Sequence, residues 1–162
     1  MGLLPNPFRA LIIGSSGTIG SAFVELLNNN SACSEVVEIH RQSEHSIDYQ
    51  NPDSIESCAT ALSLEAPFNL IINTIGVLHT SDWMPEKRLD DLNAEQLAEL
   101  MKINAIGPAL TIRYFSKHVS YVNQSRFYPF GYAELDSAIL VFDYINHLST
   151  THLSSMTTRI KL

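Results

Sequence analysis

The fold of this chain is decided by the stretch Ala10-Leu11-Ile12-Ile13-Gly14-Ser15-Ser16-Gly17-Thr18-Ile19-Gly20. Its apolar run predicts a buried strand, its three glycines predict a tight turn, and the apolar spacing that follows, up to Leu27, predicts a helix. Glycine lets a backbone approach a bound pyrophosphate, and the free amides at a helix start favour that anion. The spacing Gly14-x-x-Gly17-x-x-Gly20 differs from G-x-G-x-x-G, so an ordinary strand-to-helix turn remains an alternative.

The remaining segments alternate between strand and helix patterns. We expect the first helix to end near residues 28–30 and a short lead-in over residues 1–8. Further helices are expected over residues 51–64 and 93–117, the second capped by Asn93, with strands over residues 35–40 and 67–73 and a strand-like piece over residues 46–48. This order predicts the α/β class: a doubly wound parallel sheet of the Rossmann type, in a single domain over residues 1–162.

Composition excludes several classes of function. The net charge is −7, and no basic stripe is present to neutralise phosphates, so we expect no nucleic-acid partner. The two cysteines, Cys33 and Cys58, and the histidines lack the spacing of metal ligands, so we expect no metal site. No secretion signal and no apolar run long enough to cross a membrane is present, which predicts a soluble, cytoplasmic protein with no membrane partner.

The end of the second predicted strand bears on cofactor choice. A carboxylate that binds the adenosine ribose usually lies about 20 residues beyond the glycines. His40 and Arg41 occupy that place here, with no acid at the strand's end. A missing carboxylate beside an arginine favours a 2′-phosphate and therefore NADP over NAD, while a solvated loop cation is the alternative interpretation of Arg41.

Two further motifs carry a family resemblance. Asn73-Thr74-Ile75-Gly76 follows a predicted buried strand, and Asn104 lies in the predicted helix over residues 93–117. Together with the glycine turn, they resemble the short-chain dehydrogenase/reductase family over residues 9–118. The stretches over residues 78–79, 84–88 and 103–109 are similar to its bacterial C-factor-like branch, which is associated with cell–cell signalling.

The resemblance implies NADP-dependent hydride transfer between the cofactor and a small-molecule carbonyl or alcohol substrate. It assigns the pyrophosphate to Gly14, Ser16, Gly17, Ile19 and Gly20, the 2′-phosphate to Arg41, the adenine amino group to Asp48, the ribose and nicotinamide to Asn73, Thr74 and Gly76, and a water in the catalytic proton relay to Asn104. Plainer alternatives remain for three of these residues. Asp48 fits a turn, Asn73 fits a hydrogen bonder at a strand end, and Asn104 fits a helix residue bonded to backbone.

The sequence departs from the family where the chemistry needs a proton donor. The family supplies a tyrosine acid followed four residues later by a lysine, and this chain contains no Tyr-x-x-x-Lys. We therefore expect impaired catalysis, with a non-catalytic NADP-binding or signalling module as the alternative function. An inert product of a damaged gene is a third interpretation.

Residues 119–162 do not follow the family pattern, whose complete members continue further. They are interpreted either as a frame-shifted or truncated continuation or as a divergent ending that covers the sheet edge. The second interpretation is supported by an apolar helix face that Ala138, Ile139, Val141, Phe142, Ile145 and Leu148 could form. The missing helices would leave apolar surface exposed, which favours a homo-oligomer.

Overall fold

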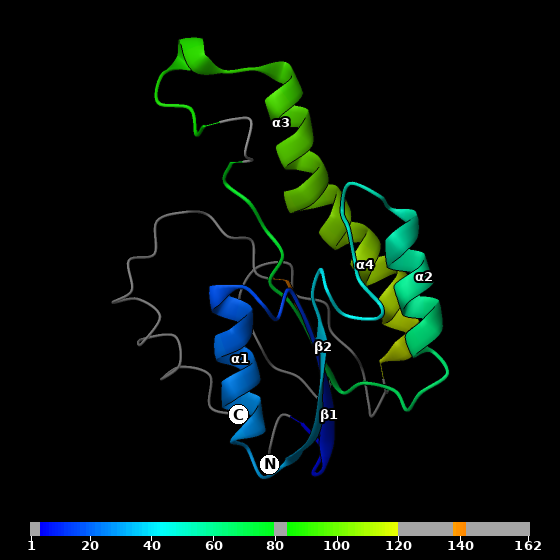
Figure 1. Cartoon of the computed structure of the whole chain (residues 1–162). Helices are drawn as coiled ribbons and strands as arrows, with labels where there is room; N and C mark the ends of the chain where they lie inside the picture. The colour runs from blue at the N-terminus through cyan, green and yellow to red at the C-terminus, as the bar shows by residue number, and fades with distance from the viewer. Residues whose placement is uncertain (1–3, 80–83, 120–137, 142–162) are drawn as a thin grey trace.

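The computed structural model describes residues 4–79, 84–119 and 138–141 (Figure 1). In this part of the chain, one parallel sheet has the strand order β2-β1-β3-β4. The strands are β1 (Phe8–Ile13), β2 (Cys33–Ile39), β3 (Leu70–Asn73) and β4 (Ala138–Val141). Because β2 and β3 lie on opposite sides of β1, the chain reverses its winding direction at β1, as doubly wound sheets do.

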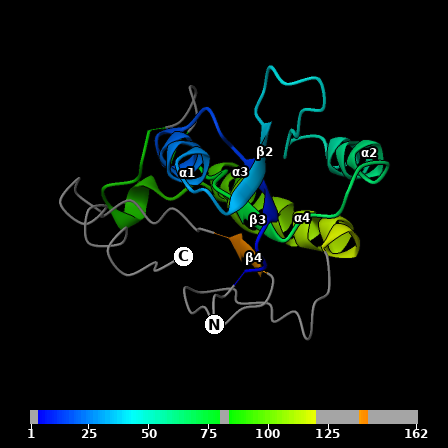
Figure 2. The same ribbon diagram turned by 90° about the horizontal axis from the view of Figure 1, so that it is seen from below.

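Helices cover both faces of this sheet (Figure 2). Helix α1 (Thr18–Asn28) lies on one face, and helices α2 (Asp53–Leu62) and α4 (Gly107–Phe115) lie on the other. All six residues of β1 are buried, and alternate side chains enter two separate apolar clusters. Ala10 and Ile12 pack on the side of α1, whereas Leu11 and Ile13 pack with α2 and α4. The predicted α/β fold is confirmed.

The predicted helix over residues 93–117 is helical throughout but is not one α-helix. It begins with α3 (Ala94–Met101), which extends away from the sheet, passes through a π-helical turn (Lys102–Ile106), and continues as α4 and a 3-10 turn (Ser116–His118). The predicted cap is confirmed, because Asn93 Oδ1 accepts hydrogen bonds from the backbone N–H groups of Glu95 (2.8 Å) and Gln96 (3.1 Å). A further 3-10 turn covers Leu89–Asp91.

Two predictions of local structure were wrong. Residues 46–48 form no strand with the sheet. Instead Asp48 pairs only with Asn51, within a turn that Asp48 Oδ1 stabilises by accepting from the Gln50 N–H (2.9 Å). Residues 138–141 form strand β4 rather than a helix and pair with β3 from Leu70–Ala138 to Asn73–Val141. A short apolar run fits either element, and here the open edge of β3 provides backbone partners. Phe142, Ile145 and Leu148 lie outside the described residues.

No helix in the described part of the chain combines the length and the apolar character that a membrane crossing requires.

Candidate functional site

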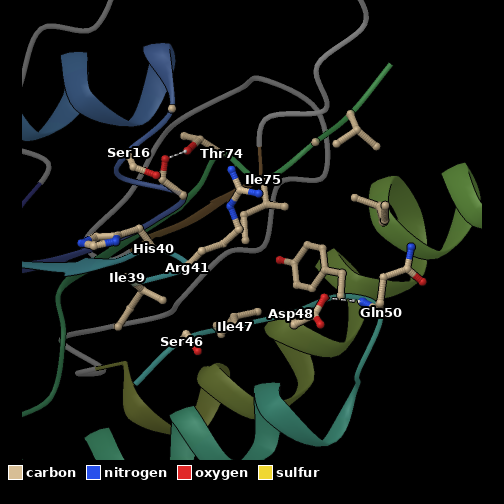
Figure 3. Close-up of a pocket in the computed structure, with 16 residues that line it drawn as sticks. Ser16, Ile39, His40, Arg41, Ser46, Ile47, Asp48, Gln50, Thr74 and Ile75 are labelled. Carbon is tan, nitrogen blue, oxygen red and sulfur yellow. Dashed lines mark hydrogen bonds between the residues drawn. The ribbon is translucent and has the colours of Figure 1, made fainter. Parts of the chain in front are cut away.

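A cavity of about 650 Å³ lies at the carboxyl ends of β1, β2 and β3 (Figure 3). It is lined by the segments that follow these strands and by Ile103 of the π-helical turn, and it is open to solvent on one side. The lining residues are Gly14, Ser16, Gly17, Ile39, His40, Arg41, Ser46, Ile47, Asp48, Tyr49, Gln50, Thr74, Ile75, Gly76, Val77 and Ile103. Both the volume and the location, where the winding direction reverses, are those of small-molecule sites in doubly wound sheets.

The glycine turn forms one wall of this cavity and requires glycine at two positions. Gly14 has a φ of 88°, a left-handed conformation, and a Cβ there would lie 2.7 Å from Thr74 Oγ1. A Cβ on Gly20 would lie 2.2 Å from the Gly14 carbonyl oxygen, so its absence lets α1 start directly against the turn. At Gly17 a Cβ would meet only that same oxygen, at 3.4 Å. Gly14 and Gly20 are therefore needed to form the turn, whereas Gly17 leaves no side chain between the backbone of the turn and the cavity.

The first turn of α1 presents free backbone donors beside the cavity. Gly17 is the N-cap in an extended conformation and makes no side-chain cap, and the first turn contains no acidic residue. The first N–H groups of a helix have no partner within the helix, and their dipoles favour an anion. Gly14, Ser16 and Gly17 line the cavity, whereas Ile19 and Gly20 do not. A pyrophosphate role for all five remains a prediction.

Arg41 supplies a cation at the end of β2. Its side chain is exposed and points into the cavity (Figure 3). Within the described residues Arg41 makes no salt bridge, in contrast to Arg9, which pairs with Glu35 and Glu65. The neighbouring His40 also lines the cavity, and its Nδ1 accepts from the Gln42 N–H (3.2 Å). The positive charge of Arg41 is therefore available to an anionic ligand.

The loop after β3 forms the wall next to the glycine turn. Thr74 Oγ1 donates to the backbone carbonyls of Ile13 (3.0 Å) and Gly14 (3.2 Å), which joins this loop to the glycine turn. Thr74 and Gly76 line the cavity. Asn73 does not, because it is fully buried beneath it and donates to the Tyr49 hydroxyl (2.7 Å). This geometry is that of a hydrogen bonder at a strand end, and a ribose contact by Asn73 remains a prediction.

Asn104 lies in the π-helical turn, and both ends of its amide bond to one neighbour. Its Nδ2 donates to the Val77 carbonyl (2.7 Å), and its Oδ1 accepts from the Val77 N–H (2.9 Å). The side chain therefore bonds to backbone, as the plainer interpretation states. The backbone it contacts belongs to the loop after β3 and not to its own helix. Single π-turns within helices are frequent at functional sites. A role for Asn104 in a proton relay remains a prediction.

Asp48 lines the cavity from the turn after β2. One carboxylate oxygen is used by the turn, through the Gln50 N–H, and the backbone N–H of Asp48 donates to Ser54 Oγ (2.9 Å). The turn role is therefore present, and an adenine contact through the other oxygen remains a prediction.

Sequence reasoning missed Tyr49, which also lines the cavity. Its hydroxyl bonds to Asn73 and to Thr111 Oγ1 (2.9 Å). Burial raises the pKa of Tyr49 and outweighs these two hydrogen bonds, which lower it, so that the pKa is about 12. No sequence motif marks the residue, since its partners lie 24 and 62 positions away. Among the described residues, no three His, Cys, Asp or Glu side chains gather as metal ligands.

Solved structures share this fold. A Listeria innocua protein is 24% identical, with a TM-score of 0.57, over 70% of this chain and 51% of its own. A Burkholderia multivorans protein assigned as a short-chain dehydrogenase/reductase, with bound NADP, is 19% identical, with a TM-score of 0.60, over 72% of this chain and 55% of its own. A carbonyl reductase from chicken fatty liver, with bound NADPH, is 20% identical, with a TM-score of 0.60, over 72% of this chain and 53% of its own.

The chain thus spans about half the length of these structures and has a distant structural similarity to short-chain dehydrogenase/reductase proteins. Neither a family model nor a curated protein matches it.

Proposed function

We propose that the cavity binds NADP and that the chain is a dehydrogenase/reductase-type domain whose chemistry is hydride transfer to or from a small carbonyl or alcohol. One observation carries the proposal. The glycine turn, the N–H groups at the start of α1 and the cation of Arg41, which makes no salt bridge within the described residues, converge on one cavity at the carboxyl ends of three parallel strands. Two structures with the same fold contain NADP or NADPH.

Each part of the dinucleotide has a candidate partner among the lining residues. The pyrophosphate would lie against Ser16 and Gly17, where the missing side chain of Gly17 lets it approach the backbone, and would accept hydrogen bonds from the N–H groups of α1. Arg41 would bind the 2′-phosphate, because its planar guanidinium donates hydrogen bonds in a geometry that suits phosphate oxygens. Asp48 would receive the adenine amino group, and Thr74 and Gly76 would lie along the ribose and nicotinamide.

We propose that hydride transfer by this domain is slow, because the expected general acid is missing. Hydride transfer to a carbonyl leaves an alkoxide that a general acid must protonate, and removing such an acid costs on the order of 10²–10⁴-fold in rate. The sequence has no Tyr-x-x-x-Lys. The hydroxyl of Tyr49 is held between Asn73 and Thr111, and burial raises the pKa of Tyr49 to about 12, which makes it a poor acid at neutral pH.

The same missing acid favours a second candidate, a non-catalytic NADP-binding module. The stretches over residues 78–79, 84–88 and 103–109 add a signalling role, by their likeness to the C-factor-like branch. The two candidates differ in one observable. An enzyme oxidises NADPH in the presence of some carbonyl, whereas a binding module does not.

Cofactor binding is tested by fluorescence titration with NADPH, with NADH as comparator. We expect saturable NADPH binding, several-fold tighter than NADH binding. Arg41→Ala should weaken NADPH binding by roughly 10- to 100-fold, the value of a charge-assisted hydrogen bond, and should leave NADH nearly unchanged. Arg113→Ala is the matched control, because it removes the same charge from a residue of α4 outside the cavity lining. Absence of binding by both dinucleotides contradicts the proposal.

A further inference from the structure

Four groups from three segments form one buried chain of hydrogen bonds beneath the cavity. Asn73 at the end of β3 donates from Nδ2 to the Tyr49 hydroxyl (2.7 Å), and this hydroxyl lies 2.9 Å from Thr111 Oγ1 of α4. Thr111 Oγ1 in turn donates to the Gly107 carbonyl (3.0 Å). Asn73 and Thr111 are fully buried, and Tyr49 is 5% exposed.

The hydrogen bonds in this series all donate in the same direction, from Asn73 toward Gly107. The amide of Asn73 is oriented by its other end, because Oδ1 accepts from the Ile75 N–H (3.1 Å), and Nδ2 can therefore only donate to Tyr49. Both hydroxyl protons then find an acceptor when Tyr49 donates to Thr111 and Thr111 donates to Gly107. Because burial raises the pKa of Tyr49 to about 12, the phenol keeps its proton at any working pH.

Packing fixes the Tyr49 ring in the same place. A Cβ added at Gly107 would lie 2.3 Å from Tyr49 Cγ, so the ring lies directly on the backbone at the start of α4. The ring can occupy this position only because residue 107 has no side chain. Tyr49 is thus held by α4 on one side and bonded to the end of β3 on the other.

We propose that Tyr49 is a positioning residue that holds the two walls of the cavity, residues 46–50 and residues 74–77, in fixed relation through this chain of hydrogen bonds. The inference rests on the proposed NADP site. On one wall Tyr49 lies between Asp48 and Gln50, which both line the cavity. On the other wall its partner Asn73 fixes the Ile75 N–H, two residues before Val77, which Asn104 clamps.

A consequence follows for a ligand that occupies only the adenosine half of the site. Such a ligand orders residues 46–50, and through Tyr49 and Asn73 it also orders residues 74–77. The coupling is lost when the hydroxyl is removed, because Asn73 Nδ2 then has no partner at Tyr49. The probe is 2′,5′-ADP, which carries the adenine and the 2′-phosphate but no nicotinamide.

The test compares Tyr49→Phe with Tyr114→Phe. Both remove one hydroxyl, and Tyr114 packs against the same apolar cluster without lining the cavity. Amide hydrogen exchange is followed in peptides that cover residues 70–79, with and without saturating 2′,5′-ADP. We expect the ligand to slow exchange in the wild type and in Tyr114→Phe. In Tyr49→Phe this slowing disappears, and NADPH binds about fivefold more weakly, the lower end of typical coupling between sites.

A merely structural tyrosine would give a different result. Tyr49→Phe would then melt at a lower temperature but, while folded, would keep the wild-type exchange response and NADPH affinity, and this outcome overturns the inference. If Tyr49→Phe does not fold, Thr111→Val removes the next link of the chain and is measured in the same way. If neither variant folds, the wild type alone tests the coupling. Amides of residues 74–77 that exchange at the same rate with and without saturating 2′,5′-ADP would then contradict it. A wild type that binds neither NADPH nor 2′,5′-ADP removes the proposed function, and this inference with it.

Discussion

Asn104 and Val77 hold each other through two hydrogen bonds, one in each direction, at 2.7 Å and 2.9 Å. The Asn104 amide thus accepts from the backbone N–H of Val77 and donates to its carbonyl, as a residue of a neighbouring strand would. It comes from the π-helical turn, where the helix departs from its regular α-helical spacing. The clamp joins the long helical segment to the wall of the cavity.

Asn104→Ala should therefore destabilise the protein. Removing the amide leaves the N–H and the carbonyl of Val77 without their partner, which costs about 1–3 kcal/mol in the free energy of unfolding. Urea denaturation followed by circular dichroism measures this difference. The control is Asn29→Ala, at an exposed residue after α1, which should change stability by less than about 0.5 kcal/mol. Equal stability of the two variants would show that the clamp contributes nothing.

The glycines of the turn should separate folding from binding. In Gly20→Ala the new methyl group meets a backbone oxygen that cannot move freely, so we expect a loss of about 1–3 kcal/mol in the free energy of unfolding. Gly17→Ala meets only a 3.4 Å contact and should cost at most about 1 kcal/mol, mainly through the weaker N-cap. Its methyl group nevertheless keeps a pyrophosphate away, so NADPH binding should weaken. Thermal melts and NADPH titrations of both variants provide the comparison, and unchanged NADPH affinity in folded Gly17→Ala would contradict the assigned role.

Arg9 should be a stability residue rather than a binding residue. It is 8% exposed, pairs with Glu35 and Glu65, donates to the Ala66 carbonyl and lies 4.4 Å from the centre of the Phe68 ring. Burial alone would lower the pKa of Arg9, but the two carboxylates raise it overall, so Arg9 stays charged. The carboxylates are about half exposed, which limits their contribution.

Arg9→Met should lower the free energy of unfolding by about 1–3 kcal/mol, because the Ala66 carbonyl and both carboxylates lose a donor. Arg113→Met removes an exposed guanidinium that stacks on Tyr114, and it should cost no more than about 1 kcal/mol. Chemical denaturation of both variants at neutral pH gives the two values. NADPH affinity should be unchanged in both, and a binding defect in Arg9→Met would place Arg9 in the site.

His118 should make stability depend on pH. Burial, and secondarily the charge of Lys117, lowers the pKa of His118 in the folded protein. The unfolded chain then binds more protons than the folded one at pH values around and below about 6.5, the ordinary pKa of histidine, so stability falls as the pH drops through this range. Urea midpoints at pH 7.5 and 5.5 should show a smaller difference in His118→Gln than in the wild type. The same difference in both would assign the pH dependence to other groups.

Local patterns predicted the elements that local forces determine. The buried strand, the glycine turn and α1 were predicted because an apolar run, three glycines and a helical spacing follow one another in the sequence. The shared location of most lining residues that have predicted roles also follows from the parallel sheet, because the carboxyl ends of parallel strands lie at one edge. Arg41 and Thr74 meet the cavity for this reason.

Long-range contacts determined what the sequence could not predict. Asn104 of the π-helical turn bonds to Val77, and the position of Tyr49 depends on Asn73 and on the missing side chain of Gly107. None of these partners is close in sequence. Residues 138–141 were predicted as a helix because their apolar spacing fits one, and they form a strand because β3 offers an open edge.

The most direct test of the proposed site is a two-dimensional NMR titration of the labelled protein with NADPH. We expect the amide signals of Gly14, Gly17, Arg41, Asp48 and Gly76 to shift in a saturable manner, while signals around Arg9 at the opposite end of the sheet do not shift. With NADH, the shift at Arg41 should be smaller than with NADPH, because NADH lacks the 2′-phosphate. Saturable shifts that avoid these cavity residues, or no shifts at all, would contradict the account.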